Sequence, residues 1–324
     1  MKIRKSILSI GWMVGFILAC VSAKAQLLPL NERPVELSTP TGQIKGKMIV
    51  PGSGEGYPVV LLIAGSGPTD MDGNSAPVQM KNNSLKYLAE DLARRGIATV
   101  RFDKRGIASS KAAGKDEYSL RFEDYEKDVA AWIDLLARDR RFKGIYVAGH
   151  SEGALLGILA SRNNPKVKGV ISIAGAGRPM DELLEEQLAG QPEVIRTMAT
   201  SICDSLKAGK LVPNVPLGMQ ALFRPSVQPF LISCFKYNPQ EEIKKLKVPV
   251  LIVQGKTDIQ VSVRDAELLK KALPAAQLVL IDNMNHVLKE CTTWDRQKQM
   301  TVYMDPDLPV NATLLSSIEK FVKQ

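Results

Sequence analysis

The chain has 324 residues, of which 45% are hydrophobic and 24% charged, and its 43 basic and 34 acidic residues give a net charge of +9. This composition is typical of a globular protein that is long enough to bury a full core. No basic tract is interleaved with aromatic side chains, which argues against a nucleic-acid-binding protein, and the chain has no internal repeat or low-complexity tract.

Residues 1–25 are expected to be an export signal. Three basic side chains lie within residues 2–5, an apolar run covers 7–19, and small residues precede a cleavage site after Ala25. The run is shorter than the ~20 residues of a membrane-spanning helix, and no later run is long enough. A retained anchor and lipoprotein processing at Cys20 are alternatives. We therefore expect a periplasmic or secreted protein, whose charge falls to +5 when the four basic residues of the signal leave.

Short β-rich runs then alternate with amphipathic helical segments, which is typical of a mostly parallel central sheet with helices on both faces. The predicted strands are residues 43–50, 58–64, 98–102, 144–148, 169–174, 248–254 and 277–281. Apolar residues at helical spacing predict helices around 85–93 and 125–136, and a last helix over 312–322. The fold class is α/β.

This alternation is interrupted by a segment that we interpret as a helical cap insertion, residues 177–245. It contains helix-like pieces at 180–188 and 192–206, followed by a proline-rich stretch. Such an insertion would cover the carboxyl edge of the sheet, where open α/β folds bind ligands. The predicted domains are a first part of the core at 26–176, the cap, and a second part of the core at 246–324.

The sequence GHSEG at residues 149–153 follows a predicted strand and precedes a predicted helix. A G-x-S-x-G motif in this context is typical of a nucleophile elbow, a tight turn that lifts a serine hydroxyl above the sheet. Ser151 is therefore the candidate nucleophile. A plain glycine-rich turn is the alternative.

A serine hydroxyl needs a base, and the chain has only two histidines. His150 adjoins Ser151 and should point away from its hydroxyl, so we interpret it as a packing or strand-end residue. His286 follows the last predicted strand and is the candidate base. Asp258, directly after the strand at 248–254, is the candidate carboxylate, and Asp282 is a weaker competitor.

Two backbone N–H groups are expected to stabilise the oxyanion of the tetrahedral intermediate. One is the N–H of Glu152, directly after the nucleophile. The other should come from the glycine-rich turn at 64–68, with Ser66 as the first candidate and Gly67 as the alternative.

Three cysteines follow the export signal, and none lies in a metal-binding pattern, so no metal is expected. Cys203 could pair with Cys234 in an oxidising compartment, which would leave Cys291 free. The spacing of the cysteines in the sequence does not decide whether this disulfide forms.

These motifs resemble those of the α/β-hydrolase superfamily, and of bacterial serine carboxylesterases in particular. The resemblance spans the mature chain and is carried by AGSGP at 64–68, FDKRG at 102–106, GHSEG at 149–153, QGKTD at 254–258 and NHVLK at 285–289. Ala64, Met71 and Ala108 depart from the usual residues of this family. The last of these lies in a loop that shapes the rim of the site, so the substrate preference stays open.

The resemblance implies an α/β-hydrolase fold and hydrolysis of carboxylic esters with short to medium acyl groups, through an acyl-enzyme and without a cofactor. The partner would be a small-molecule ester. A serine aminopeptidase or peptidase, an acyl-thioester hydrolase and a non-enzymatic binding protein are the alternatives. Glutamates 182, 185 and 186 of the cap could bind an amine terminus. No substrate-binding residue is assigned, although apolar cap residues could line an acyl pocket, namely Leu183, Leu184, Leu211, Met219, Leu222, Phe223 and Phe230.

Overall fold

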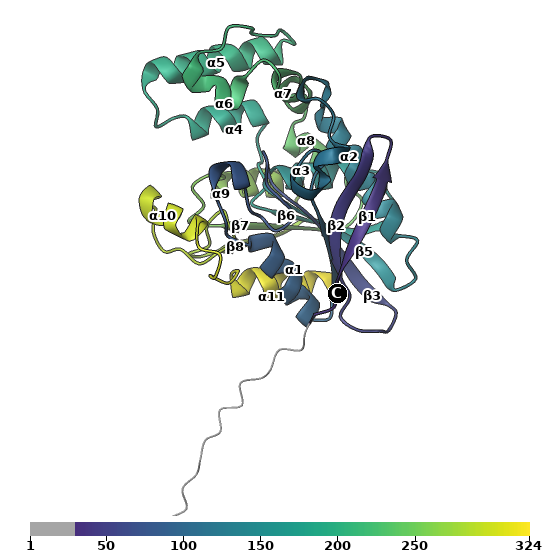
Figure 1. Cartoon of the computed structure of the whole chain (residues 1–324). Helices are drawn as coiled ribbons and strands as arrows, with labels where there is room; N and C mark the ends of the chain where they lie inside the picture. The colour runs from purple at the N-terminus through teal and green to yellow at the C-terminus, as the bar shows by residue number, and fades with distance from the viewer. Residues whose placement is uncertain (1–29) are drawn as a thin grey trace, which may run out of the picture.

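The computed structural model describes residues 30–324, so the predicted export signal and Cys20 lie outside the described residues. Its centre is an eight-stranded sheet with the order β1-β2-β4-β3-β5-β6-β7-β8 (Figure 1). The strands are β1 (Glu32–Thr39), β2 (Gly42–Ile49), β3 (Tyr57–Ile63), β4 (Ala98–Phe102), β5 (Phe142–His150), β6 (Val167–Ile173), β7 (Val250–Gly255) and β8 (Gln277–Ile281). Strand β2 is antiparallel to β1 and β4, and all other neighbours are parallel. The predicted mostly parallel sheet is confirmed.

Strand β1 was not predicted from the sequence. Its sequence, ERPVELST, is rich in charged and polar residues and contains Pro34, and most of its side chains are at least partly exposed. An edge strand is exposed to water along one side, so it can carry polar residues and a proline. It therefore lacks the apolar pattern by which the other strands were predicted. The seven predicted strands agree with β2 to β8 to within two residues at either end.

Helices cover both faces of the sheet. Helices α1 (Ser84–Arg94) and α11 (Ala312–Val322) pack on one face, and α2 (Phe122–Leu136), α3 (Glu152–Ser161) and α9 (Val263–Ala272) pack on the other. Helix α1 buries its leucines at 85, 88 and 92, a spacing that places them on one stripe. Each such leucine contributes about 1.5–3 kcal/mol relative to an exposed position. The sheet is thus covered by an apolar layer on each face.

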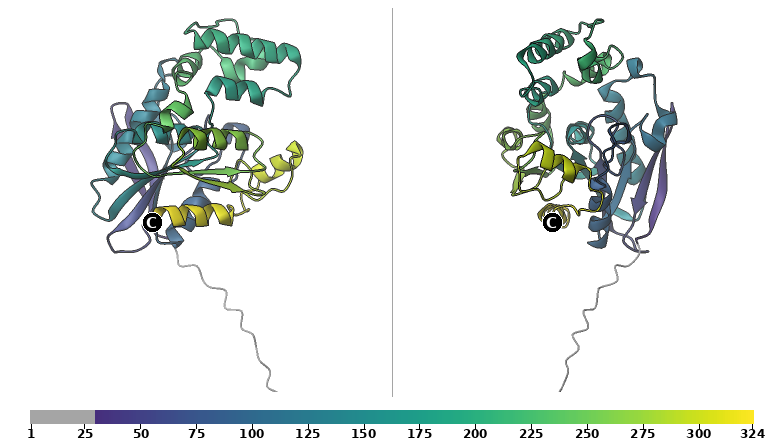
Figure 2. Two further views of the ribbon diagram at one scale, coloured as in Figure 1. Left: turned by 180° about the vertical axis from the view of Figure 1, so that it is seen from behind. Right: turned by 60° about the vertical axis from the view of Figure 1, so that its left-hand side comes forward.

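Five helices lie between β6 and β7, within the predicted cap: α4 (Met180–Gln187), α5 (Glu193–Lys207), α6 (Gln220–Phe223), α7 (Gln228–Cys234) and α8 (Pro239–Ile243). Helices α4 to α6 gather at one end of the molecule, above the sheet (Figures 1 and 2). Helix α10 (Arg296–Tyr303) and four short 3-10 helices, η1 (Ala76–Val78), η2 (Ala108–Ala113), η3 (Glu117–Ser119) and η4 (Leu217–Met219), complete the described elements. Within residues 30–324, no helix is long and apolar enough to cross a membrane.

The first residues of the predicted cap are hydrogen-bonded to helix α9. Asp265, which is fully buried, accepts hydrogen bonds from Arg178 Nε at 3.0 Å, from Arg178 Nη2 at 2.7 Å and from the Gly177 N–H at 3.0 Å. Burial opposes ionisation of this carboxyl, but Arg178 outweighs it and holds the pKa of Asp265 below its usual value. A Cβ atom on Gly177 would lie 2.2 Å from the Asp265 carbonyl oxygen, so only glycine permits this approach.

The three cysteines of the described chain are buried free thiols, so the disulfide left open between Cys203 and Cys234 is absent. Both residues lie among the apolar side chains of the larger core cluster. Burial raises the pKa of Cys203 to about 12 and that of Cys234 well above its usual value, which keeps both in the unreactive thiol form.

Candidate active site

Ser151 lies in a strained turn between β5 and α3. Its φ of +54° is unusual for a residue with a side chain, and its N–H donates to the Ile173 carbonyl at 2.9 Å. A Cβ atom on Gly149 would lie 1.9 Å from the Gly153 carbonyl oxygen, and one on Gly153 would lie 2.4 Å from the Ile63 carbonyl oxygen. The two glycines of the G-x-S-x-G motif are therefore required by the close packing of strand, turn and helix.

Asp258 and His286 are joined by a buried hydrogen bond. The loop after β7 carries Asp258 and the loop after β8 carries His286, and His286 Nδ1 lies 2.8 Å from Asp258 Oδ2. Gln254 Nε2 donates to the same oxygen at 3.0 Å, while the N–H groups of Gln260 and Val261 donate to Oδ1 at 2.8 and 2.9 Å. Burial opposes ionisation, but His286 and these N–H groups together hold the pKa of Asp258 below its usual value. Asp258 is therefore an ionised, fully bonded carboxylate.

The competing carboxylate, Asp282, lies elsewhere. Its side chain is 78% exposed and pairs with Lys256 at 2.8 Å rather than with His286. Of the two aspartates considered from sequence, only Asp258 orients the histidine.

His150 makes a specific contact that the sequence did not reveal. It is buried, its ring centroid lies 4.8 Å from that of His286, and its Nε2 lies 2.8 Å from the His286 carbonyl oxygen. Because a carbonyl can only accept, Nε2 carries the proton. Burial, with a smaller contribution from His286, lowers the pKa of His150 to about 3, so this ring is neutral. His150 thereby ties the loop of the candidate base to the residue before the candidate nucleophile.

Ser151 and His286 open into the same cavity, of about 240 Å³. Its wall also contains Gly65, Ser66 and His150, together with Pro68, Thr69, Gly73, Ser75, Val78, Met80, Ser84, Gln260, Val287 and Tyr303. The residues nominated as nucleophile, base and first oxyanion donor thus meet at one cavity. Their roles in a reaction stay predictions.

The glycine-rich loop after β3 lies against the nucleophile. A Cβ atom on Gly65 would be 3.2 Å from Ser151 Cβ. The turn that follows β4 holds this loop, since Asp103 Oδ1 accepts the Met71 N–H at 2.6 Å and Lys104 Nζ donates to the Gly65 carbonyl at 2.5 Å. The nominated residue Ser66 lies in this loop, and the alternative Gly67 has a φ of +67°.

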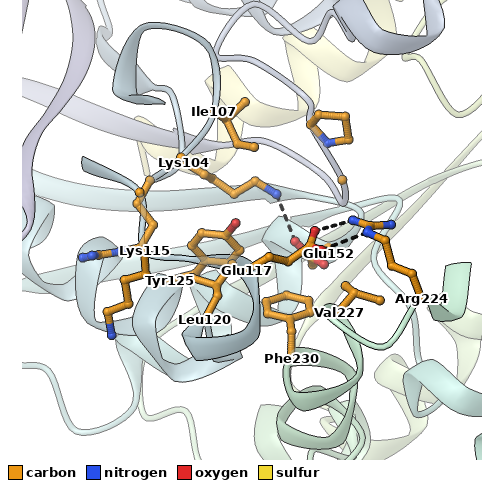
Figure 3. Close-up of a pocket in the computed structure, with 15 residues that line it drawn as sticks. Lys104, Ile107, Lys115, Glu117, Leu120, Tyr125, Glu152, Arg224, Val227 and Phe230 are labelled. Carbon is orange, nitrogen blue, oxygen red and sulfur yellow. Dashed lines mark hydrogen bonds and ion pairs between the residues drawn. The ribbon is translucent and has the colours of Figure 1, made fainter. Parts of the chain in front are cut away.

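A second cavity, of about 290 Å³, is lined by the same loop at Gly67 and Pro68 and by Glu152, the residue that follows Ser151 (Figure 3). Pro68 borders both cavities. The apolar side chains in its wall are Ile107, Leu120, Val227 and Phe230, and the phenol of Tyr125 faces the same space. Two ion pairs form part of its wall, one between Lys104 and Glu152 and one between Arg224 and Glu117.

Of the seven apolar cap residues considered from sequence, only Phe230 lines this cavity. Leu183, Met219 and Phe223 are buried, Leu184 is partly buried against the larger core cluster, and Leu211 and Leu222 are exposed. The spacing of apolar residues cannot distinguish a residue that lines a pocket from one in the core, because both positions are apolar.

Among residues 30–324, no group of three or more His, Cys, Asp and Glu side chains is arranged to hold a metal ion.

Comparisons with known proteins agree with this architecture. A family model described as serine aminopeptidase, S33, matches residues 80–226, under half of the chain. Esterase EstD of Thermotoga maritima is 27% identical over 250 residues, which are 76% of this chain and 58% of that protein. The chain thus spans less than two thirds of the length of this curated relative.

Solved structures share the fold at low identity. Est1E from Butyrivibrio proteoclasticus superposes with a TM-score of 0.57 at 16% identity, over 90% of this chain and 97% of that one. The alpha/beta hydrolase GrgF from Penicillium sp. sh18 superposes with a TM-score of 0.59 at 14% identity, over 90% and 99% of the two chains. At these identities the likeness concerns the fold alone.

Proposed function

We propose that this chain, which has the α/β-hydrolase fold, is a serine hydrolase that cleaves carboxylic esters with Ser151, His286 and Asp258 as its catalytic triad. The observation that carries the proposal is the buried hydrogen bond of 2.8 Å between Asp258 and His286. It lies beside the cavity that His286 shares with Ser151, whose φ is positive. The chain order Ser, Asp, His is that of α/β-hydrolases. The similarity to an esterase supports the choice of ester over other acyl compounds.

The reaction would have two stages. Ser151 Oγ attacks the ester carbonyl as its proton passes to His286 Nε2, which is free to accept because Nδ1–H is bound to Asp258. The N–H groups of Ser66 and Glu152 stabilise the oxyanion. Collapse expels the alcohol, which takes the proton from Nε2. Water then attacks the acyl-enzyme by the same route and releases the carboxylic acid, leaving the serine free.

The cavity beside the cap is our proposed acyl site. Its volume of about 290 Å³ lies at the small end of ligand pockets, which are about 300–1,000 Å³. Four of its charged side chains form the two ion pairs described above, and the other two, Arg105 and Lys115, pair with Asp128 and Asp124 outside the cavity, so that every charge in the wall is paired. It suits an uncharged acyl group of short to medium length.

The test is hydrolysis of p-nitrophenyl esters of graded acyl length by the chain from Gln26, beside Ser151→Ala and an aminoacyl-p-nitroanilide. We expect turnover of short esters that is lost in Ser151→Ala. Phe230→Ala should move the preferred length upward, whereas the matched cap variant Leu222→Ala, at an exposed position, should not. Absence of ester turnover would refute the proposal.

An aminopeptidase is the second candidate, because of the description of the matching family model. It needs an acidic group that binds an amine at the site. Glu186 is instead paired with Arg178, and neither Glu182 nor Glu185 lines either cavity. Cleavage of the anilide alone would favour this candidate. An acyl-CoA thioesterase is disfavoured because export would separate it from its substrate.

Export itself is part of the proposal and rests on the basic and apolar pattern of residues 1–25. Expression of the full chain in a bacterial host should yield a mature protein that begins at Gln26. A lipoprotein beginning at Cys20, or a full-length protein in the cytosol, would contradict the proposed cleavage. N-terminal sequencing of the fractionated protein distinguishes these outcomes.

A further inference from the structure

Lys104 is a buried cation beside the candidate active site, yet the triad makes no use of it. Its side chain is 2% exposed and pairs with Glu152, itself 4% exposed, at an Nζ–Oε1 distance of 3.0 Å (Figure 3). The ammonium also lies 5.1 Å from the centroid of the Tyr125 ring. A buried ion pair is a weak source of stability, because desolvation of both charges offsets their attraction. Its location therefore calls for a different explanation.

The contact of Lys104 with the loop after β3 is to one particular peptide group. Lys104 Nζ donates to the Gly65 carbonyl at 2.5 Å. The N–H of the same peptide belongs to Ser66, the proposed oxyanion donor. In a planar trans peptide the C=O and N–H point in opposite directions, so a cation that holds the carbonyl also aims the N–H. Lys104 lines the cavity beside the cap, and Ser66 lines the cavity of Ser151, so this N–H is aimed to the Ser151 side.

The other half of the ion pair belongs to the second proposed donor. Glu152 follows the nucleophile, and its backbone N–H is the second group expected to face the oxyanion. Its carboxylate binds the same ammonium that binds Gly65. One cation is therefore bonded to the backbone of one donor segment and to the side chain of the other, and it sets the distance between them.

We propose that the Lys104–Glu152 ion pair is a positioning device for the oxyanion hole, which fixes the direction of the Ser66 N–H and its spacing from the Glu152 N–H. This inference rests on the proposed function. The ammonium of Lys104, bonded to the Gly65 carbonyl, also polarises this peptide group and strengthens its N–H as a donor. The pair acts on the transition state, where the oxyanion forms, and much less on the bound ester.

The test replaces Lys104 with methionine, which retains the length of the side chain without its charge. Loss of one whole oxyanion donor costs about 10²–10³ in kcat, and a misdirected donor should cost less, about 10–100-fold. We expect KM for p-nitrophenyl acetate to change less than threefold. Affinity for a trifluoromethyl ketone, whose serine adduct carries the oxyanion, should fall in parallel with kcat/KM.

The matched control is Lys289→Met. Lys289 is also buried, also donates to a backbone carbonyl, that of Asp305 at 2.6 Å, and also lies near a tyrosine ring, that of Tyr87 at 5.8 Å. It lines neither cavity. The control should lose stability as Lys104→Met does but retain kcat within about threefold.

If Lys104→Met does not fold, Glu152→Ala serves instead, since it removes the carboxylate that positions Lys104 and retains the backbone donor. We expect its kcat and its ketone affinity to fall at least threefold. A folded Lys104→Met, or otherwise Glu152→Ala, with wild-type kcat and ketone affinity would overturn the inference. Failure of the wild-type protein to hydrolyse any ester would instead overturn the proposed function on which it rests.

Discussion

Replacement of Asp258 by asparagine should abolish most of the activity because the surroundings dictate which way the new amide faces. Asp258 Oδ1 accepts the backbone N–H groups of Gln260 and Val261, and Oδ2 accepts His286 Nδ1–H and Gln254 Nε2. The two backbone donors cannot turn round, so the amide oxygen of the asparagine takes the position of Oδ1. Its NH2 group then faces His286 Nδ1 and donates to it.

This donation reverses the tautomer of His286. With Nδ1 accepting, the proton resides on Nε2, which can no longer take the proton of Ser151. The same exchange in a serine triad costs about 10⁴ in kcat, or about 5.4 kcal/mol of transition-state stabilisation. Gln254 would also face the new NH2 group with its own donor, so we expect a further loss of about 1–3 kcal/mol in the free energy of unfolding.

The assay is kcat with p-nitrophenyl acetate, together with urea unfolding to separate activity from stability. Asp282→Asn is the control, because that carboxylate is exposed and its ion pair with Lys256 contributes at most about 1 kcal/mol. We expect the control to stay within twofold of the wild type. Retention of more than a tenth of kcat in Asp258→Asn would refute this account of the tautomer.

Three further predictions concern stability. His150 has a pKa of about 3 in the folded chain and an ordinary value near 6.5. The unfolded chain therefore binds more protons between these values, and acid destabilises the fold by up to about 1.4 kcal/mol per pH unit. Urea unfolding at pH 6, 5 and 4 should show a shallower loss in His150→Gln; equal slopes would contradict the buried neutral ring. Ala108 has a φ of +41°, so Ala108→Gly should raise the free energy of unfolding by up to about 1 kcal/mol, and a decrease would count against strain there. Gly149→Ala places a Cβ atom 1.9 Å from the Gly153 carbonyl oxygen and should cost about 3 kcal/mol or more, so an unchanged melting temperature would disprove the packing argument.

The strands and the site motifs could be predicted from sequence because their signals are local. The parallel strands are continuous apolar runs, and GHSEG carries its two glycines at the positions where the packing leaves no room for a Cβ atom. Asp258, which the structure places against His286, could be nominated because it directly follows a strand, where functional groups of this fold class collect. Strand β1 was missed because exposure at an edge removes the apolar pattern.

The contacts that join distant segments could not be predicted. His150 meets the carbonyl of His286, 136 positions later, and Lys104 meets Gly65 and Glu152 from a third segment of the chain. Each residue reads locally as a polar side chain at the end of a strand. Only the parallel order of the sheet, which brings the carboxyl ends of β3, β4, β5 and β8 to one edge, gives them partners.

The hydrogen bonds between Arg178 and Asp265 also limit how helices α4 to α6 can move. Gly177 and Arg178 are bonded to a carboxylate that has no exposure to water, so the chain leaves the sheet along a fixed path. Any opening of helices α4 to α6 has to hinge beyond residue 178. Amide hydrogen exchange at Gly177 would then follow global unfolding of the protein, while the helices above it exchange through smaller, independent fluctuations. Substrate would then enter through a motion of helices α4 to α6, while Gly177 and Arg178 stay in place.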